Sequence, residues 1–233
     1  MAKTKPIFAK KTVINLPSIA SLNDTHYAKE YLLKRKIPRE CMNDIYYAEN
    51  YRDFIKELRP EYDKKLYAEP RIVIPFYDEK KNLLGVQGRL LGASGIKYIT
   101  VKLDDDNKKV FGLDRVDFTK KVYVVEGPID SMFLNNAVAT MDASLYNINL
   151  LLGTHDYVFI HDNEPRNPAI VKQMAKTISH GKNIFIWPQN VDAKDINDWI
   201  LTGATVSEIQ SIIDRNTFCD LSANLEFERW KKV

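Results

Sequence analysis

The chain is poor in cysteine: Cys41 and Cys219 are far apart in a sequence of 233 residues. Two such residues cannot form a zinc site by themselves, and they do not suggest a disulfide-stabilised scaffold. No apolar run approaches the roughly 20 residues that a membrane-spanning helix requires. The basic N-terminus also lacks the apolar core of a signal peptide. These absences predict a soluble protein of the cytoplasm that makes no contact with a membrane.

Several catalytic signatures are also missing. The sequence has no Gly-x-Ser-x-Gly elbow, no Walker loop and no internal repeat. The net charge of +3 is too small to require or to exclude a nucleic-acid partner. A hydrophobic fraction of 45% is that of an ordinary folded protein, and the length suits one large domain or two small ones.

The first half of the chain changes its periodicity at about residue 69. Up to that point the spacing of apolar residues is helical, and beyond it extended apolar segments alternate with polar turns. This pattern predicts an arm and helical region over 1–68, followed by a small basic α+β subdomain over 69–117. The expected elements are an irregular arm over 1–20, helical segments over 23–36 and within 41–68, and strands over 71–77, 83–91 and 97–101.

The second half alternates short apolar strands with helices, which is typical of a parallel sheet with helices on both faces. We expect this α/β domain over 118–215 and a C-terminal tail over 216–233. Its expected strands are 122–125, 137–140, 157–160 and 184–187, and its expected helices are 128–135, 147–152, 168–180, 196–201 and 205–214.

Acidic residues follow these strands, where α/β proteins bind ligands. Glu126 closes the first strand and Asp162 the third, and Glu164 would point to the same side as Asp162 if the segment were extended. Asp192 and Asp195 follow the fourth strand. Neighbouring carboxylates repel one another unless a hard cation such as Mg²⁺ lies between them. The pattern therefore predicts a metal site.

A plainer interpretation exists for each of these residues. A single acid after a strand is more often a helix cap or a solvated loop residue, although three of them at neighbouring strand ends are harder to explain in this way. His161 is expected to be structural, and Trp187 and Trp199 to belong to the core. The clusters of charged residues, both basic and acidic, are as consistent with a solvated surface as with a binding site.

Three segments resemble, in order, the motifs of the Toprim family. The first ends a strand with Glu-Gly, the second ends a strand with an acidic pair, and the third is a loop that precedes a helix. Further segments upstream resemble bacterial-type DNA primases, and most closely the phage and mitochondrial-helicase branch. The Toprim-like segments are VVEGPIDSM (124–132), FIHDNEPRN (159–167) and VDAKDINDWI (191–200); the primase-like ones are AKEYLLKRKIP (28–38), RIVIPFYDEKKNLLGVQGRLLG (71–92), KYIT (97–100) and VFGLDR (110–115).

The resemblance covers about residues 25–215 and implies a Toprim-type parallel sheet flanked by helices, preceded by a smaller α+β subdomain. It also implies an activity, the synthesis of short RNA primers from nucleoside triphosphates on a single-stranded DNA template. The implied catalytic residues are Glu126, Asp162 and Glu164, which would bind Mg²⁺ (or Mn²⁺) together with Asp195, supported by Gly127 and Asp130. The implied contacts to nucleic acid or nucleotide are Arg71, Arg89, Lys97 and Lys102.

The chain departs from the family pattern in several places. The second motif has Asp-x-Glu instead of Asp-x-Asp, and Asn197 stands where a second acid is usual. A zinc ribbon and a helicase segment are not found, so we expect a replicative helicase and a separate zinc-binding primase chain as partners. The setting would be the cytoplasm of a bacterium or a phage-infected host, in preference to a mitochondrion. The segment 222–233, with Leu225, Phe227 and Trp230, would either dock such a partner or pack on the chain's own core.

Two other functions compete with primer synthesis. A Toprim nuclease would use the same carboxylates to hydrolyse a phosphodiester, but it would not need the primase-like segments upstream. A non-catalytic nucleic-acid-binding or replisome module descended from a primase would account for the altered motifs, and for a protein that is inactive alone.

Overall fold

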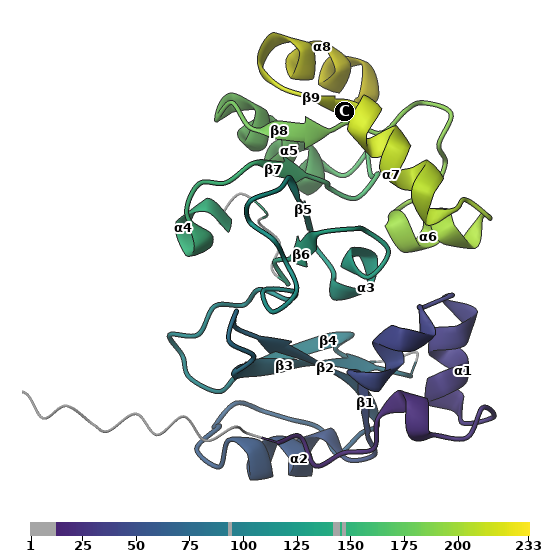
Figure 1. Cartoon of the computed structure of the whole chain (residues 1–233), viewed down its shortest axis with the longest axis vertical. Coiled ribbons are helices and arrows are strands. Elements are labelled where there is room, and N and C mark those ends of the chain that lie inside the picture. Colours follow the sequence, from purple (N-terminus) through teal and green to yellow (C-terminus); the bar gives the residue numbers. More distant parts are fainter. Residues whose placement is uncertain (1–12, 93–94, 142–144, 146–147) are drawn as a thin grey trace, which may run out of the picture.

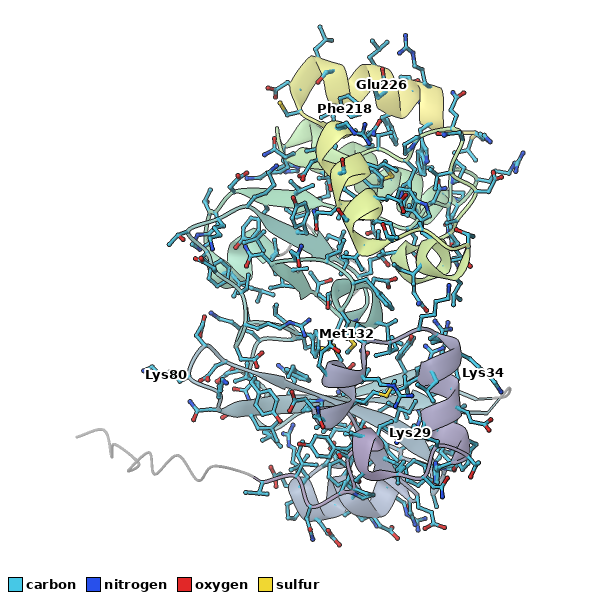
Figure 2. The ribbon with its side chains drawn as sticks, turned by 45° about the vertical axis from the view of Figure 1, so that its right-hand side comes forward. Lys29, Lys34, Lys80, Met132, Phe218 and Glu226 are labelled. Carbon is cyan, nitrogen blue, oxygen red and sulfur yellow. The ribbon has the colours of Figure 1, made fainter. Side chains whose placement is uncertain are left out.

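The structure is a computed structural model that describes residues 13–92, 95–141, 145 and 148–233. The chain forms two sheets, one in each of two lobes stacked along the long axis of the molecule (Figure 1). We call them the first lobe, built around strands β1–β4, and the second lobe, built around strands β5–β9. Met132 lies at the level where the two lobes meet (Figure 2). Within the described ranges, no helix is long and apolar enough to cross a membrane.

The first lobe holds an antiparallel sheet in the order β1-β2-β3-β4. Ile72, Ile74 and Phe76 on one face of β2 join the main core, whereas Val73 on the other face joins a smaller core with helix α2. The sheet is therefore covered on both faces, which explains why β2 and β3 are almost entirely buried. The elements of this lobe are η1 (Ile19–Ser21), α1 (Tyr27–Lys34), η2 (Arg39–Asn43), β1 (Tyr46–Ala48), α2 (Tyr51–Leu58), β2 (Arg71–Tyr77), β3 (Leu83–Leu90) and β4 (Tyr98–Lys102).

A buried arginine organises the centre of this sheet. A Cβ at Gly88 would lie 2.5 Å from the Tyr51 ring, so the glycine is what allows this ring to approach β3. The Arg71 guanidinium lies 5.5 Å from the centre of the same ring. Its donors bind the Glu69 carboxylate and three backbone carbonyls, two of them in the loop before β4. These bonds hold the loop and thereby place Lys97.

The second lobe holds a sheet in the order β6-β5-β7-β8-β9, in which the first four strands are parallel and β9 is antiparallel to β8. Strands β5, β6 and β7 are fully buried, as apolar runs are when helices cover both faces. This topology confirms the expected fold class. The strands are β5 (Val122–Val125), β6 (Ala137–Ala139), β7 (Tyr157–Phe159), β8 (Asn183–Phe185) and β9 (Thr217–Phe218), and the helices are α3 (Pro128–Ser131), α4 (Ile148–Leu152), α5 (Pro168–Ser179), α6 (Ile196–Leu201), α7 (Val206–Arg215) and α8 (Asp220–Trp230).

Among the contacts that join the lobes are two sets of hydrogen bonds. Phe111 exchanges backbone hydrogen bonds of 2.8 and 3.0 Å with Ala139 of β6. The Arg35 guanidinium donates to the side-chain oxygen of Asn197 (2.6 Å), and the Asn197 amide donates to the Arg35 carbonyl (2.8 Å). Asn197 is buried, and its backbone N–H donates to Asp130 over 2.9 Å. The asparagine that replaces an expected acid is thus a link between the lobes.

The expected tail is part of the second lobe. Strand β9 extends the sheet and helix α8 packs against α5. Phe227 and Trp230 are buried in the main core, whereas Leu225 is exposed. Of the two possibilities that the sequence left open for 222–233, packing on the chain's own core is therefore confirmed for the two aromatic residues.

The N-terminal region differs most from the sequence-based expectation. The first α-helix begins at Tyr27, because His26 is its N-cap and accepts from the N–H of Ala28; Asn23 accepts from Thr25 in the turn before it. The region 41–68 is divided by strand β1, after which Asn50 caps α2. Residues 1–12 of the expected arm, and Asn147 at the start of an expected helix, lie outside the described residues.

Candidate active site

Carboxylates gather at the carboxyl ends of two parallel strands. Glu126 directly follows β5, and Asp162 follows β7 after two intervening residues. Strands β5 and β7 are hydrogen-bonded neighbours, with Val124 opposite Phe159, so their ends meet at one edge of the sheet. The topology thus brings together two acids that are far apart in the sequence, as predicted.

Two further acids complete the group. Asp130 lies in α3, just after Glu126, and Asp195 is the N-cap of α6, with its carboxylate accepting from the N–H of Asp198 over 2.7 Å. All four acids line one cavity of about 570 Å³, into which Lys97 also extends from the first lobe. The site therefore lies between the lobes, and we call Glu126, Asp130, Asp162 and Asp195 the acidic cluster.

Burial and neighbouring carboxylates raise the pKa of two members of the acidic cluster, Asp130 and Asp162. Burial, followed by the charges of Glu126, Asp130 and Asp195, raises the pKa of Asp162 to about 8. Burial and the neighbouring Asp195 also raise the pKa of Asp130. A bound cation would stabilise the charged forms of these carboxylates, so the cluster is suited to binding a positively charged group.

One oxygen of the cluster has no partner. Glu126 Oε1 is buried and, among the described residues, receives no hydrogen bond; the same is true of Nδ1 of the buried His161, 3.8 Å away. The other ring nitrogen of His161 lies 3.3 Å from the Thr177 hydroxyl. His161 therefore has the buried, structural position that was expected for it, as do Trp187 and Trp199, whose buried rings are 5.4 Å apart.

Glu164 does not lie with the acidic cluster. The backbone N–H of Glu164 donates to the carbonyl of Asp162 over 2.9 Å, so the segment turns instead of extending. The extended segment on which the shared direction of the two side chains depended is therefore not present. The Glu164 carboxylate binds Asn167 (2.5 Å) and Lys194 (2.6 Å), and both interactions lower its pKa. Its role as a metal ligand stays a prediction.

Two of the expected cations are close to the acidic cluster. Lys97 lines the cavity, and burial followed by the charges of Arg89 and Arg35 lowers its pKa. Arg89 is buried, hydrogen-bonds the Tyr98 hydroxyl and lies 5.0 Å from the centre of the Tyr31 ring. Lys97 can thus reach a ligand directly, whereas Arg89 mainly adds positive potential from behind Tyr98.

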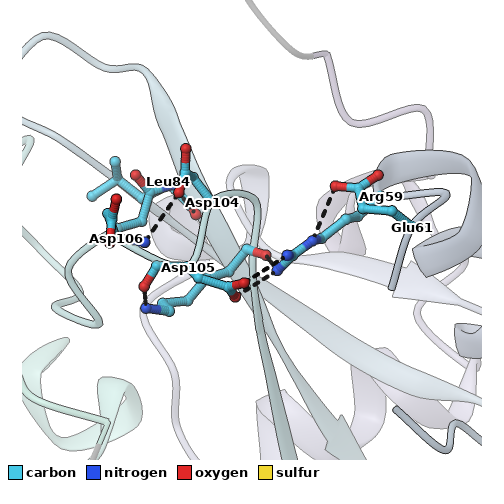
Figure 3. A network of polar contacts seen from close by, with 8 residues as sticks. Arg59, Glu61, Leu84, Asp104, Asp105 and Asp106 are labelled. Atoms are coloured by element: carbon cyan, nitrogen blue, oxygen red, sulfur yellow. Dashed lines mark hydrogen bonds and ion pairs between the residues drawn. The ribbon is translucent and has the colours of Figure 1, made fainter. Parts of the chain in front are cut away.

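The other two expected cations have different positions. The guanidinium of Arg71 is fully buried and bound by its own chain, so its expected contact with phosphate does not fit the structure. Lys102 lines a separate cavity of about 250 Å³ and donates to the carbonyl of Asp105. In the same cavity Arg59 binds the Asp105 carboxylate through two nitrogens, and also binds Glu61 (Figure 3).

Lys194 and Gln87 are among the cavity-lining residues that sequence reasoning missed. Lys194 precedes Asp195 and lines the cavity from the second lobe, and Gln87 lies on β3 in the first lobe. The position of Lys194 within the third Toprim-like segment was a usable signal. Gln87 gave no such signal, because a glutamine in an apolar strand is not distinctive.

The comparison with known proteins covers the residues of both lobes. No family model matches the chain. It is 31% identical over 230 residues to the DNA primase of Enterobacteria phage T4, and the match covers 96% of this chain and 67% of that protein. The chain belongs to the DNA primase family. Because the match includes almost the whole chain, it covers both lobes.

Solved primase structures share this fold. The zinc-binding and RNA polymerase domains of the Aquifex aeolicus primase match with a TM-score of 0.63 at 20% identity, covering 86% of this chain and 57% of that one. The DnaG primase catalytic domain bound to single-stranded DNA matches with a TM-score of 0.62 at 18% identity, covering 84% and 74%. At these identities the likeness concerns the primase fold, and the roles of individual residues must be argued from their geometry.

Proposed function

We propose that this primase core joins ribonucleotides into short RNA primers on a single-stranded DNA template, and that the reaction takes place at the acidic cluster. The observation that carries this proposal is the cavity between the lobes, in which the cluster faces Lys97 and Lys194. Nucleotidyl transfer needs a site for divalent cations and a site for a triphosphate, close together. This cavity offers anions for the first and cations for the second.

The acidic cluster fits Mg²⁺ or Mn²⁺ by its chemistry. As the described side chains stand, no set of three or more has the geometry to enclose a metal ion. Mg²⁺ does not require such a cage, because it commonly uses one or two carboxylates and takes its other ligands from water and phosphate. The unpartnered Glu126 oxygen and the raised pKa of Asp162 support these two residues as ligands. A bound cation would supply charge neutralisation at the reacting phosphate and lower the pKa of the attacking hydroxyl.

The lysines of the cavity have separate tasks in this proposal. Lys97 lies on the first lobe, opposite the acidic cluster, and would pair with the triphosphate of the incoming nucleotide. Lys194 is held by Glu164, so its ammonium group is already oriented before substrate binds. Arg89 is enclosed by tyrosine rings and would add attraction for phosphate without leaving its place.

The template would follow the basic side of the first lobe. The cavity around Arg59 and Lys102 shares Thr100 and Lys109 with the main cavity, so the two are adjacent. Single-stranded nucleic acid binds to positively charged grooves of this kind. The DnaG domain with a similar fold is bound to single-stranded DNA, which supports the same partner here. A replicative helicase and a zinc-binding primase chain are further partners that we propose.

Primer synthesis tests the proposal directly. The protein is incubated with single-stranded DNA, labelled ribonucleotides and Mg²⁺ or Mn²⁺, beside the variant Glu126→Gln and the surface control Glu79→Gln. We expect short labelled RNA from the wild type and the control, and none from Glu126→Gln. Cleaved template instead of RNA would indicate a nuclease. DNA binding without any product, equal in all three proteins, would contradict catalysis by this chain alone.

A further inference from the structure

Asn163 lies between Asp162 and Glu164, and its side chain makes three hydrogen bonds, two as donor and one as acceptor. The amide nitrogen donates to the carbonyls of Val191 (3.0 Å) and Ala193 (2.9 Å). The amide oxygen accepts from the indole N–H of Trp230 over 2.9 Å. The backbone N–H of Asn163 also donates to the carbonyl of Lys194 over 2.7 Å. The residue is thus bonded at four points, and none of them belongs to its own turn.

These bonds join the two loops that carry the site. One loop follows β7 and holds Asp162, and the other follows β8 and holds Lys194 and Asp195. Parallel strands place such loops next to each other, but β7 and β8 share backbone pairing only as far as Phe159 and Ile184. Beyond that point the Asn163 side chain supplies cross-links of the kind that a sheet would otherwise provide.

The C-terminal helix α8 also takes part in this arrangement. Trp230 is buried, and its ring lies 6.1 Å from that of Phe227 on the same helix. Two residues further on, the backbone N–H of Lys232 donates to the carbonyl of Pro165 over 2.9 Å. The end of α8 therefore holds the loop after β7 at two places, Asn163 and Pro165.

We propose that Asn163 is a positioning residue of the active site, and that Trp230 completes it from the C-terminal helix. The inference rests on the proposed function, because it concerns the distance between Asp162 and Asp195 at the acidic cluster. Without the indole donor, the amide of Asn163 loses the contact that fixes its orientation, and its donors no longer hold the Val191–Lys194 segment. The acids then spend less time at the spacing that a divalent cation requires.

The test is the binding of Mn²⁺ alone, followed by electron paramagnetic resonance of the free ion, together with the Mn²⁺ dependence of primer synthesis. Trp230→Phe removes the N–H and keeps an aromatic ring. Phe227→Leu is the matched control, because it loosens the packing of the same helix without touching the hydrogen bond. We expect Trp230→Phe to weaken Mn²⁺ binding by about 5-fold and Asn163→Ala by about 10-fold or more.

A positioning role predicts a particular pattern in the kinetics. Trp230→Phe should raise the Mn²⁺ concentration needed for half-maximal activity while leaving the nucleotide KM at saturating Mn²⁺ unchanged. Phe227→Leu should lower Tm without changing the affinity for Mn²⁺. In the Asn163→Ala background, Trp230→Phe should have no additional effect, because both changes remove the same link. If Trp230→Phe does not fold, Asn163→Ala is compared with Phe227→Leu in its place.

The outcomes separate this inference from the proposed function. Unchanged Mn²⁺ affinity in Trp230→Phe and Asn163→Ala would overturn the positioning role, and so would an equal loss in Phe227→Leu. If Glu126→Gln binds Mn²⁺ as the wild type does, the proposed metal site itself fails. Loss of binding in Glu126→Gln with full binding in Trp230→Phe leaves the function standing and removes only the positioning role.

Discussion

The two lobes differ in whether their buried charged groups have partners within the chain. In the first lobe the buried cation Arg71 is neutralised by Glu69 and by backbone carbonyls of its own chain. In the second lobe burial, followed by the charges of Glu126, Asp130 and Asp195, raises the pKa of Asp162. Removing one partner of a buried, paired charge destabilises a fold, whereas a charge that is left unsatisfied is itself destabilising and remains available to a ligand. The comparison predicts opposite effects for substitutions in the two lobes.

The largest effect is expected from Arg71→Met. Removing the guanidinium leaves the Glu69 carboxylate and the carbonyls before β4 without their donors, which we expect to cost about 3 kcal/mol of unfolding free energy. Lys97 should lose its fixed position, and primer synthesis should fall as well. Urea denaturation measures the stability, with Arg52→Ala, at a side chain that is 43% exposed, as the control. A stability like that of the control would show that the buried cation is not structural.

Asp162→Asn should raise the free energy of unfolding, whereas Arg71→Met lowers it. The folded-state pKa of Asp162, about 8, lies above the usual value of 3.8, so the folded protein binds more protons than the unfolded one between these limits. Stability from this group is therefore lost as pH rises from about 4 to 8. In EDTA at pH 8 we expect Asp162→Asn to be more stable than the wild type by roughly 1–2 kcal/mol. In the primer-synthesis assay, with the metal ion present, this variant should be inactive.

The measurement for Asp162 is Tm by scanning calorimetry in EDTA at pH 5 and at pH 8. The gain from Asp162→Asn should be small at pH 5 and larger at pH 8, while Glu79→Gln on the surface should show no such difference. A wild type that becomes more stable relative to Asp162→Asn on going to pH 8 would contradict the reasoning.

Lys97→Met tests a cation that the first lobe leaves free for a ligand. Its side chain lines the cavity and its ammonium lies 5.5 Å from the centre of the Tyr98 ring, so stability should change little. The KM for nucleoside triphosphate should rise about 10-fold through the loss of a charged contact. Steady-state kinetics at saturating template measure this, and Lys80→Met in the exposed turn before β3 is the control (Figure 2). An unchanged KM would remove Lys97 from the binding site.

The smallest effect is expected from Asp105→Asn. Its pair with Arg59 lowers the pKa of Asp105, but the pair lies at the surface (Figure 3). Exposed ion pairs contribute little and are screened by salt. Thermal unfolding at low and at high salt should therefore show a shift of about a degree or less. A large loss of Tm that does not depend on salt would mean that the Arg59–Asp105 pair stabilises the fold as the buried Arg71 does.

Much of the fold could be predicted from the sequence. The strand over 71–77 and the strand over 122–125 were recognised by their β-branched and apolar residues, and both agree with the structure. The short strand β1 was missed, because three residues beside helical segments give no periodicity. The tail was separated from the α/β domain because no local pattern shows that β9 pairs with β8.

The parts of the site that lie at strand ends could be predicted from the sequence. The parts that depend on how deeply a side chain is buried, or on a turn of the backbone, could not. Glu126 and Asp162 were found from their places after apolar runs. The burial of Arg71 was not visible, since a charged residue in a strand gives no indication of how deep it lies. The direction of Glu164 depends on a turn at Asp162, and the bond between Asn163 and Trp230 joins residues 67 positions apart. Contacts of this kind are determined by tertiary packing.

The segment that connects the lobes runs from β4 to β5, and two backbone hydrogen bonds between Phe111 and Ala139 attach it to the second sheet. β6 is the edge strand of the second sheet, and Phe111 covers part of that edge. The connecting segment is therefore not a free tether, because it also shields an edge that is open to pairing with other chains. A protease cut or an insertion beside Phe111 would expose β6, so self-association through that edge would accompany any loosening of the two lobes.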